Sequence, residues 1–129
     1  MSQKIVNVAV GIILRGEQSF ICKRPDDKHQ GGLWEFPGGK IEDNETTTQA
    51  LARELKEEIA IDVHSSEPFM LIEHDYGDKK VRLDIHTVSH FSGEPHGAEG
   101  QQGQWVDIDK LSSFSFPKAN EAILDKLCS

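Results

Sequence analysis

The sequence has only two cysteines, no long apolar run and few basic residues, and each shortage excludes a class of protein. Cys22 and Cys128 are too few for a disulfide framework, and such usage is typical of a reduced, cytoplasmic setting. No apolar stretch approaches the roughly 18 residues that a membrane-spanning helix needs, so we expect no membrane segment. The alternating N-terminal segment lacks a small-residue cleavage site, and we expect no signal peptide.

The shortage of basic residues limits the kind of ligand that the chain can bind. Lysine and arginine number 14 against 22 aspartates and glutamates, which gives a formal net charge of −8. Affinity for long nucleic acids comes largely from Lys and Arg on phosphates, so we expect no nucleic-acid polymer as a partner. A small phosphorylated ligand is still compatible, because a divalent metal reverses the local sign of the charge. The length fits a single domain, residues 1–129, and we expect a monomer.

Strand and helix patterns alternate along the chain. Runs rich in apolar and β-branched residues predict strands or extended segments at 6–14, 19–24, 33–36, 68–76, 80–91 and 103–108. Thr46 with Gln49 forms a capping box before an apolar stripe, which predicts the first helix. Pro117 predicts the first turn of a second helix over 117–127. Strands interleaved with two helices predict an α/β or α+β sandwich around one sheet.

The first helix carries three carboxylates beside its apolar stripe. At about 100° per residue, Glu54, Glu57 and Glu58 lie on one arc next to the stripe, and not on the opposite face. A solvated acidic face is the usual interpretation of a glutamate-rich helix. Next to the core, however, carboxylates repel one another in a partly desolvated place, and a hard dication with oxygen ligands would relieve that repulsion. The spacing alone leaves both interpretations open.

The segment GKIEDNETTTQALARELKEEIAI resembles the signature of the Nudix hydrolases, G-x5-E-x7-R-E-U-x-E-E-x-G-U, in which U is an apolar residue. The matching residues are Gly39, Glu45, Arg53, Glu54, Leu55, Glu57, Glu58 and Ile61. Ala60 stands where the signature has glycine. A glycine there suits a left-handed helix cap, so we expect Ala60 to cost about 1 kcal/mol of stability and to remove no ligand.

The resemblance implies an α/β/α sandwich around a mixed β-sheet, with a loop–helix–loop that binds Mg²⁺, for which Mn²⁺ can substitute. The implied metal ligands are the side chains of Glu54, Glu57 and Glu58 and the carbonyl of Gly38. Glu45 would orient the loop and Arg53. For Arg53 we favour a structural ion pair over a direct contact to phosphate.

Three further stretches, WEFPGGK, EGQQGQW and FPKANEAI, resemble a bacterial branch of this family that hydrolyses 8-oxo-dGTP. The resemblance implies water attack at the β-phosphorus, release of 8-oxo-dGMP and pyrophosphate, and removal of a mutagenic precursor from the nucleotide pool. Glu99 would be a further metal ligand or the base that deprotonates water, and Glu54 is the alternative base.

Asn120 is the candidate that reads the oxidised base. Oxidation at C8 puts a hydrogen on N7 of guanine, and an asparagine amide can donate to O6 while it accepts from N7–H. From its position alone, Asn120 is better explained as a polar residue in the first turn of the last helix. The resemblance of the surrounding FPKAN segment favours the interpretation as a base-binding residue instead.

Other residues resemble nucleotide-contacting positions of the family: Arg24, His29, Phe36 and Asp78. Arg24 is equally explained as a surface arginine, and Phe36 as a core aromatic. Lys79 stands where we would expect arginine, and we assign it no role. We expect Trp34 and Trp105 to pack and not to stack on a base.

Three alternative functions stay open. The first is a Nudix enzyme for another substrate, such as ADP-ribose, a dinucleoside polyphosphate or another NTP. The second is a catalytically silent nucleotide sensor, and the third is a structural acidic domain without a ligand. Zinc at His86 and His90 is disfavoured, because a closed zinc site needs four ligands. Neither cysteine lies in the context of a nucleophile.

Overall fold

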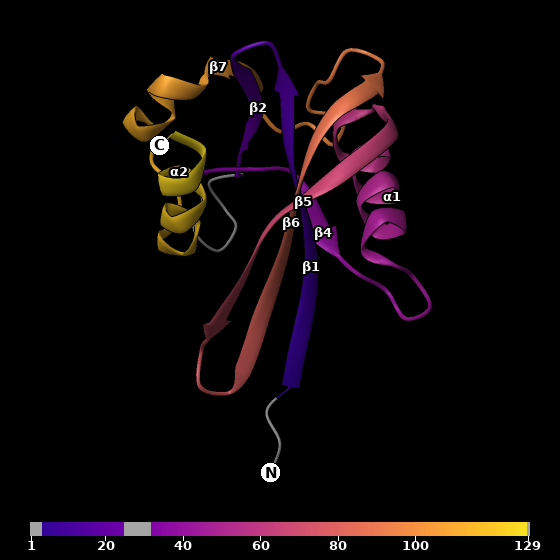
Figure 1. Ribbon diagram of the computed structural model, residues 1–129, viewed down its shortest axis with the longest axis vertical. Helices are drawn as coiled ribbons and strands as arrows, with labels where there is room; N and C mark the ends of the chain where they lie inside the picture. The colour runs from indigo at the N-terminus through magenta and orange to yellow at the C-terminus, as the bar shows by residue number, and fades with distance from the viewer. Residues whose placement is uncertain (1–3, 25–31, 129) are drawn as a thin grey trace.

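The structure is a computed structural model that describes residues 4–24 and 32–128. The predicted contact residue His29 lies outside the described residues. In the described part, a mixed sheet runs between two helices, α1 (Thr47–Ile59) and α2 (Glu121–Cys128), which lie on either side of it (Figure 1). None of the described helices is long and apolar enough to cross a membrane.

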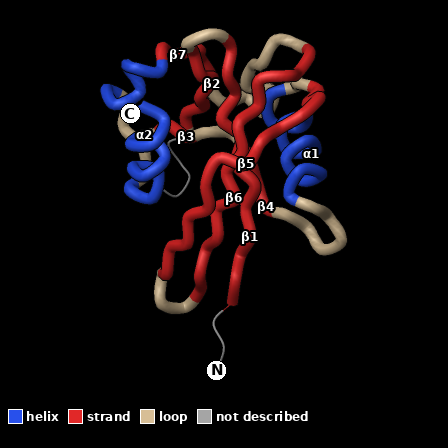
Figure 2. The backbone as a smooth tube through the Cα atoms, in the orientation of Figure 1, coloured by secondary structure: helices blue, strands red, loops and turns tan. Residues whose placement is uncertain are grey.

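The sheet is mixed because its central pair of strands is parallel and its other pairs are antiparallel. Its strands are β1 (Lys4–Arg15), β2 (Gln18–Lys23), β3 (Trp34–Glu35), β4 (Gly38–Lys40), β5 (Asp62–Asp75), β6 (Lys79–Ser92) and β7 (Gly103–Asp107). The order is β3-β2-β1-β6-β5, with β4 paired to β1 and β7 to β2. β1 and β6 form the parallel pair. Figure 2 shows the β5–β6 hairpin extending past the helices at the lower end.

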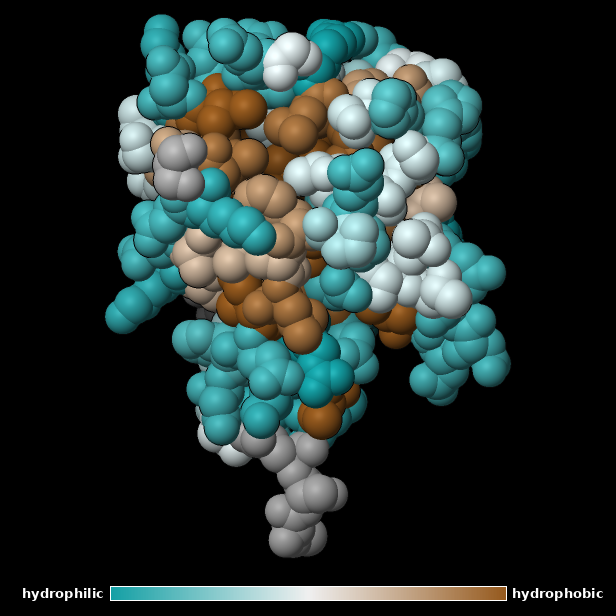
Figure 3. Space-filling view, viewed as in Figure 1, coloured by the Kyte–Doolittle hydropathy of each residue, from teal (hydrophilic) through white to brown (hydrophobic). Residues whose placement is uncertain are grey.

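β1 supplies alternate side chains to two hydrophobic clusters, one on each face of the sheet. Ala9 and Ile13 pack with the buried stripe of α1, as the alternation of a strand requires. Val10 and Ile12 face the other way and pack with Ile123 of α2. Apolar side chains gather over the middle and upper parts of the view in Figure 3, and hydrophilic ones cover the hairpin end.

The first helix begins as the sequence predicts. The Thr46 hydroxyl accepts a hydrogen bond from the backbone N–H of Gln49, and the Gln49 side chain accepts one from the N–H of Thr46. This capping box satisfies two of the donors that a helix start leaves unpaired. The predicted apolar stripe, Leu51, Leu55 and Ile59, is fully buried.

Three elements differ from the prediction. β5 begins at Asp62 and not at residue 68, because register shifts between residues 63 and 70 break the alternation that the sequence would otherwise show. The segment after Pro117 is a separate 3-10 turn, Lys118–Asn120, in which the Asn120 N–H donates to the Pro117 carbonyl. Asn120 therefore lies just before α2, and not in its first turn. A short strand, β4, forms at Gly38–Lys40, where the sequence pattern predicts no strand.

Helix α1 ends at Ala60 in the left-handed conformation that the signature's glycine would favour. Ala60 has φ 63° and ψ 36°, and its N–H donates to the carbonyls of Leu55 and Lys56. The predicted cap is thus confirmed, and alanine occupies a conformation that costs L-residues about 1 kcal/mol or more.

Replacing Ala60 with glycine should raise the free energy of unfolding by about 1 kcal/mol, because glycine adopts the left-handed cap without steric cost. Urea denaturation measures the change. Ala52→Gly in the interior of the same helix is the matched control and should lower the free energy of unfolding by about the same amount. Equal losses in the two variants would contradict the strained cap.

Candidate active site

Two glycines let the backbone of β4 come close to α1. A Cβ at Gly38 would overlap the carbonyl oxygen of Ala9, and a Cβ at Gly39 would overlap the carboxyl group of Glu54. Across this contact, the Gly38 N–H donates to Oε2 of Glu58 at 3.2 Å. The two glycines therefore bring the strand within reach of the carboxylates on the helix.

Arg53 holds the segment before the helix to the helix itself. Its guanidinium donates to both carboxylate oxygens of Glu45, at 2.8 and 3.0 Å, and to Oε1 of Glu54 at 2.8 Å. A further bond runs to the carbonyl of Lys40 at 3.1 Å, and Glu57 is 3.6 Å away. The expected ion pair is present, and it lowers the pKa of Glu45 and raises that of Arg53. Arg53 fixes Glu54 while it leaves the second oxygen of that carboxylate unengaged by the guanidinium.

Glu58 is the buried carboxylate of the site. It is only 9% exposed, although it carries a charge when ionised. Burial raises its pKa from 4.5 to about 8, and the negative charges of Glu35, Glu99 and Glu54 add to the shift, which the Gly38 N–H opposes. Among residues 4–24 and 32–128, the charges that act on Glu58 are all negative. A proton or a cation at this carboxylate is therefore strongly favoured.

Glu99 reaches this region from the loop between β6 and β7. The Ala98 N–H donates to the main-chain carbonyl of Glu58 at 3.0 Å, which places the next residue beside the end of α1. Glu99 is exposed, and its charge acts on the carboxylate of Glu58. The structure thus brings together three of the predicted ligands, Glu54, Glu58 and Glu99, with Gly38. The fourth, Glu57, is more than half exposed on the outer side of the helix.

The donor set fits a hard divalent metal. No three His, Cys, Asp or Glu side chains of the described residues already stand at ligand distance from a common point. The fit comes from chemistry: oxygen ligands, mutual repulsion, and a buried carboxylate that holds its proton up to about pH 8. Glu54, Glu58 and Glu99 are the side chains that would hold such an ion.

Glu35 also belongs to this region, and the sequence analysis missed it. It lies on β3 opposite Cys22, its charge raises the pKa of Glu58, and it pairs with Arg24 at 2.9 Å. The available signal was an acidic residue between two aromatics, Trp34 and Phe36, in an extended segment. Cys22 is buried under these carboxylates, and burial together with their charge raises its pKa to about 12, so it is no nucleophile.

The predicted nucleotide contacts fall in different places. Phe36 is buried and stacks on Phe116 with ring centroids 5.3 Å apart, which ties the segment before Gly38 to the segment before Asn120. Asn120 is half-buried at the end of that second segment. Arg24 is half-buried and paired with Glu35.

Asp78 is not brought to this region. It is exposed at the tip of the β5–β6 hairpin, next to Lys79. In the sheet, Lys79 of β6 lies opposite Lys4 of β1. Gly38 of β4 lies opposite Val10, which is further along β1. The six steps along the strand from Lys4 to Val10 span about 20 Å at 3.3 Å per residue.

The residues that the sequence analysis discounted have structural roles. His86 bonds to the Ser66 hydroxyl at 3.1 Å and lies 3.3 Å from Asp84, and no metal cluster includes it among the described residues. Trp105 packs edge-on against Phe20, as expected.

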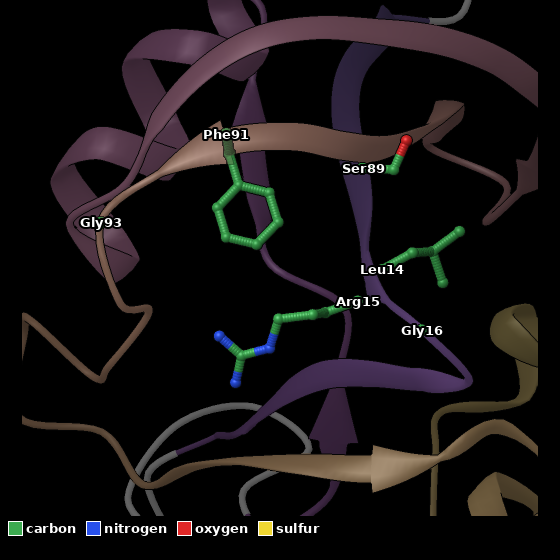
Figure 4. Close-up of a pocket in the computed structure, with 6 residues that line it drawn as sticks. All are labelled: Leu14, Arg15, Gly16, Ser89, Phe91 and Gly93. Atoms are coloured by element: carbon green, nitrogen blue, oxygen red, sulfur yellow. The ribbon is translucent and has the colours of Figure 1, made fainter.

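A surface hollow lies apart from the carboxylates, where β1 turns into β2 and β6 ends (Figure 4). It is lined by Leu14, Arg15, Gly16, Ser89, Phe91 and Gly93. Arg15 in this hollow pairs with Glu94 at 2.7 Å and lies over the ring of Trp105. The hollow contains no predicted site residue, and the concentration of carboxylates around Glu58 marks the candidate site instead.

Comparisons with known proteins show which sequences and folds this chain resembles. The sequence matches the NUDIX domain family over residues 9–126. It is 42% identical over 126 residues to the 8-oxo-dGTP diphosphatase of Escherichia coli K12, covering 96% of this chain and 97% of that protein. It is 30% identical to the CTP pyrophosphohydrolase of the same organism, covering 95% and 90%. A solved structure from work on MutT of Aliivibrio salmonicida and Vibrio cholerae has a TM-score of 0.89 and 42% identity, covering 97% and 98%. This likeness confirms the predicted α+β fold.

Replacing Glu58 with glutamine should stabilise the protein in EDTA at alkaline pH. The folded-state pKa of Glu58 is raised to about 8. Between pH 4.5 and about 8 the folded state binds more protons than the unfolded state, so the free energy of unfolding falls as pH rises. At about 1.4 kcal/mol per pKa unit, the loss reaches a few kcal/mol, and Glu58→Gln removes it.

Urea denaturation near pH 5 and near pH 9 measures this effect. Glu57→Gln, on the exposed side of the same helix, is the matched control and should leave the pH dependence of the wild type unchanged. Parallel pH dependences of the wild type and Glu58→Gln would show that Glu58 is not the destabilised carboxylate.

Proposed function

We propose a specific reaction for this chain, which belongs to the Nudix family and is a hydrolase acting on phosphoric anhydride bonds. The proposed substrate is 8-oxo-dGTP, and the products are 8-oxo-dGMP and pyrophosphate. The observation that carries the phosphoanhydride chemistry is the buried carboxylate of Glu58, surrounded by negative charge and set against the glycines of β4. The substrate comes from the relatives that are 8-oxo-dGTP diphosphatases, at 35–44% identity.

The proposed cofactor is Mg²⁺, with Mn²⁺ as a substitute. Glu54, Glu58, Glu99 and, less directly, Glu57 would hold it, with the carbonyl of Gly38 as a further ligand. When bound, the metal would polarise phosphoryl oxygens and lower the pKa of water. It would also offset the repulsion among the carboxylates, so that a triphosphate can approach an acidic protein.

The residues of the chain itself then divide the work of positioning and proton transfer. Arg53 engages one oxygen of Glu54 and keeps that carboxylate in place. The proton from the attacking water would go to the second oxygen of Glu54 or to Glu99, whichever of the two carboxylates does not hold the metal. The water oxygen bonds to the β-phosphorus, and the bond from that phosphorus to the oxygen that bridges it to the α-phosphorus breaks. The nucleoside monophosphate leaves with the bridging oxygen, and pyrophosphate carries the oxygen of water.

Recognition of the base would fall to the segment that ends at Asn120. Its amide can donate to O6 and accept from N7–H of the oxidised guanine, whereas N7 of normal guanine would face the amide oxygen with a lone pair. The stack of Phe36 on Phe116 fixes this segment relative to Gly38, so that the base and the phosphates are read by one rigid frame. Arg24 and Asp78 stay predictions as contacts, as does His29.

The relative that hydrolyses CTP favours a second candidate, a pyrophosphohydrolase for another nucleoside triphosphate. An asparagine amide also complements the donor and acceptor of a cytosine edge. We propose that the chain acts as a monomer in the cytoplasm in either case.

With Mg²⁺, the protein should hydrolyse 8-oxo-dGTP with a higher kcat/KM than dGTP or CTP and release pyrophosphate and not phosphate. Chromatography of the products measures this. Glu54→Gln should lower kcat by roughly 10²–10⁴-fold, the range typical of a lost group that acts in proton transfer or charge stabilisation. Preference for CTP would favour the second candidate, and no turnover of any triphosphate would favour a nucleotide sensor.

Asn120→Ala should reduce the preference for 8-oxo-dGTP over dGTP by roughly 10–100-fold, because a bidentate amide contact discriminates by about 1–3 kcal/mol. The ratio of the two kcat/KM values measures it. Pyrophosphate release from dGTP should change little, which separates base recognition from catalysis. An unchanged ratio would remove Asn120 from the base site.

A further inference from the structure

We propose that Gln101 is a positioning residue that clamps the loop carrying Glu99 to the C-terminal end of α1. The clamp sets the distance between Glu99 and Glu58, and it rests on the proposed function only in taking these two residues as ligands of one metal site. Gln101 itself touches neither metal nor nucleotide in this proposal.

The side chain of Gln101 joins the two residues directly. Its Nε2 donates to the main-chain carbonyl of Glu58 at 2.9 Å. Its Oε1 accepts from the main-chain N–H of Glu99 at 3.0 Å. One amide therefore connects the backbones of two candidate ligands that are 41 residues apart in the sequence (99 − 58).

The rest of the loop follows the same path along the helix end. The His96 N–H donates to the carbonyl of Ile59 at 3.1 Å, and the Ala98 N–H donates to the carbonyl of Glu58 at 3.0 Å. These bonds satisfy carbonyls that the last turn of a helix leaves unpaired. A Cβ at Gly97 would overlap the carbonyl oxygen of Gln101, so the loop can close on itself only with glycine at this position.

The amide group suits both bonds of the clamp. The Glu58 carbonyl accepts from the Gln101 NH₂ group in addition to the Ala98 N–H, and the Glu99 N–H donates to the Gln101 side-chain oxygen, so one glutamine supplies a donor and an acceptor. A carboxylate of the same length would accept from Glu99 but would face the Glu58 carbonyl without a proton. An apolar side chain would make neither bond. The tip of the loop is exposed at Glu99 and Gly100, so few other contacts would hold Glu99 in place.

The test measures binding of Mn²⁺ to the full chain without nucleotide, from the electron paramagnetic resonance signal of the free ion. Gln101→Met, which keeps the length of the side chain but not its polar groups, should raise the Kd for Mn²⁺ by roughly 10-fold, the lower end for a lost outer-shell contact. Gln102→Met is the matched control, since Gln102 is exposed and bonds to Lys23 through its backbone carbonyl. It should leave the Kd unchanged.

A double-mutant cycle with Glu99→Gln separates positioning from a general loss of structure. If Gln101 acts through Glu99, Gln101→Met should raise the Kd much less in the Glu99→Gln background than in the wild type. Equal effects in both backgrounds, or no effect of Gln101→Met, would overturn the proposal. So would an unchanged Kd in Glu99→Gln alone. Should Gln101→Met fail to fold by circular dichroism, Gln101→Asn, which keeps an amide too short to span both partners, takes its place in the cycle.

Turnover distinguishes this proposal from the proposed function. A protein that shows the expected cycle but does not hydrolyse 8-oxo-dGTP keeps the clamp and loses the substrate assignment. A protein that hydrolyses 8-oxo-dGTP but shows additive effects on the Kd keeps the function and loses the clamp.

Discussion

The arrangement of the site depends on one carboxylate that is kept out of water. Glu58 lies on α1 at the border of its apolar stripe, so the helix that builds the core also buries the charge. Three nearby carboxylates, Glu35, Glu54 and Glu99, act on it with the same sign, and the hydrogen bond from the Gly38 N–H offsets this only in part. Titratable groups perturbed by both burial and a specific set of charges are typical of functional sites.

The neighbouring structure follows from holding these like charges together. Gly38 and Gly39 bring a backbone N–H to one oxygen of Glu58 where any side chain would collide. Arg53 pairs with Glu45 and Glu54 and joins the loop to the helix across the outer side of the site. The Gly38 N–H and the Arg53 guanidinium thus position the acids, and in the proposed function a bound metal would balance the charge of Glu58.

Local signals in the sequence predicted the elements whose physics is local. Thr46 and Gln49 lie three residues apart, so their capping box and the helix after it could be identified without the fold. The glutamates on α1 were identified in the same way, from a spacing and a family signature. The contributions that depend on tertiary pairing could not be seen. Nothing in the sequence of Gly38–Lys40 indicates that this segment would pair with β1. Glu35 comes close to the other carboxylates only because β3 pairs with β2, which places Glu35 opposite Cys22.

Register shifts and turns account for the remaining differences. The bulges in β5 hide six residues of strand from an alternation pattern, and Pro117 starts a 3-10 turn where a helix was expected. Both depend on hydrogen bonds to partners that sequence periodicity does not specify.

The central strand β1 contributes side chains to both hydrophobic clusters, one on each face of the sheet. Ala9 and Ile13 belong to the cluster on the side of α1 and the carboxylates, and Val10 and Ile12 belong to the cluster on the side of α2 and the residues around Phe116. In the proposed function, hydrolysis and base recognition would therefore depend on side chains that pack in different clusters. Substitutions in the cluster on the α2 side could then change which nucleobase is accepted, while the carboxylates on the α1 side continue to cleave the same bond. Such a separation would let one hydrolytic scaffold serve many nucleotides.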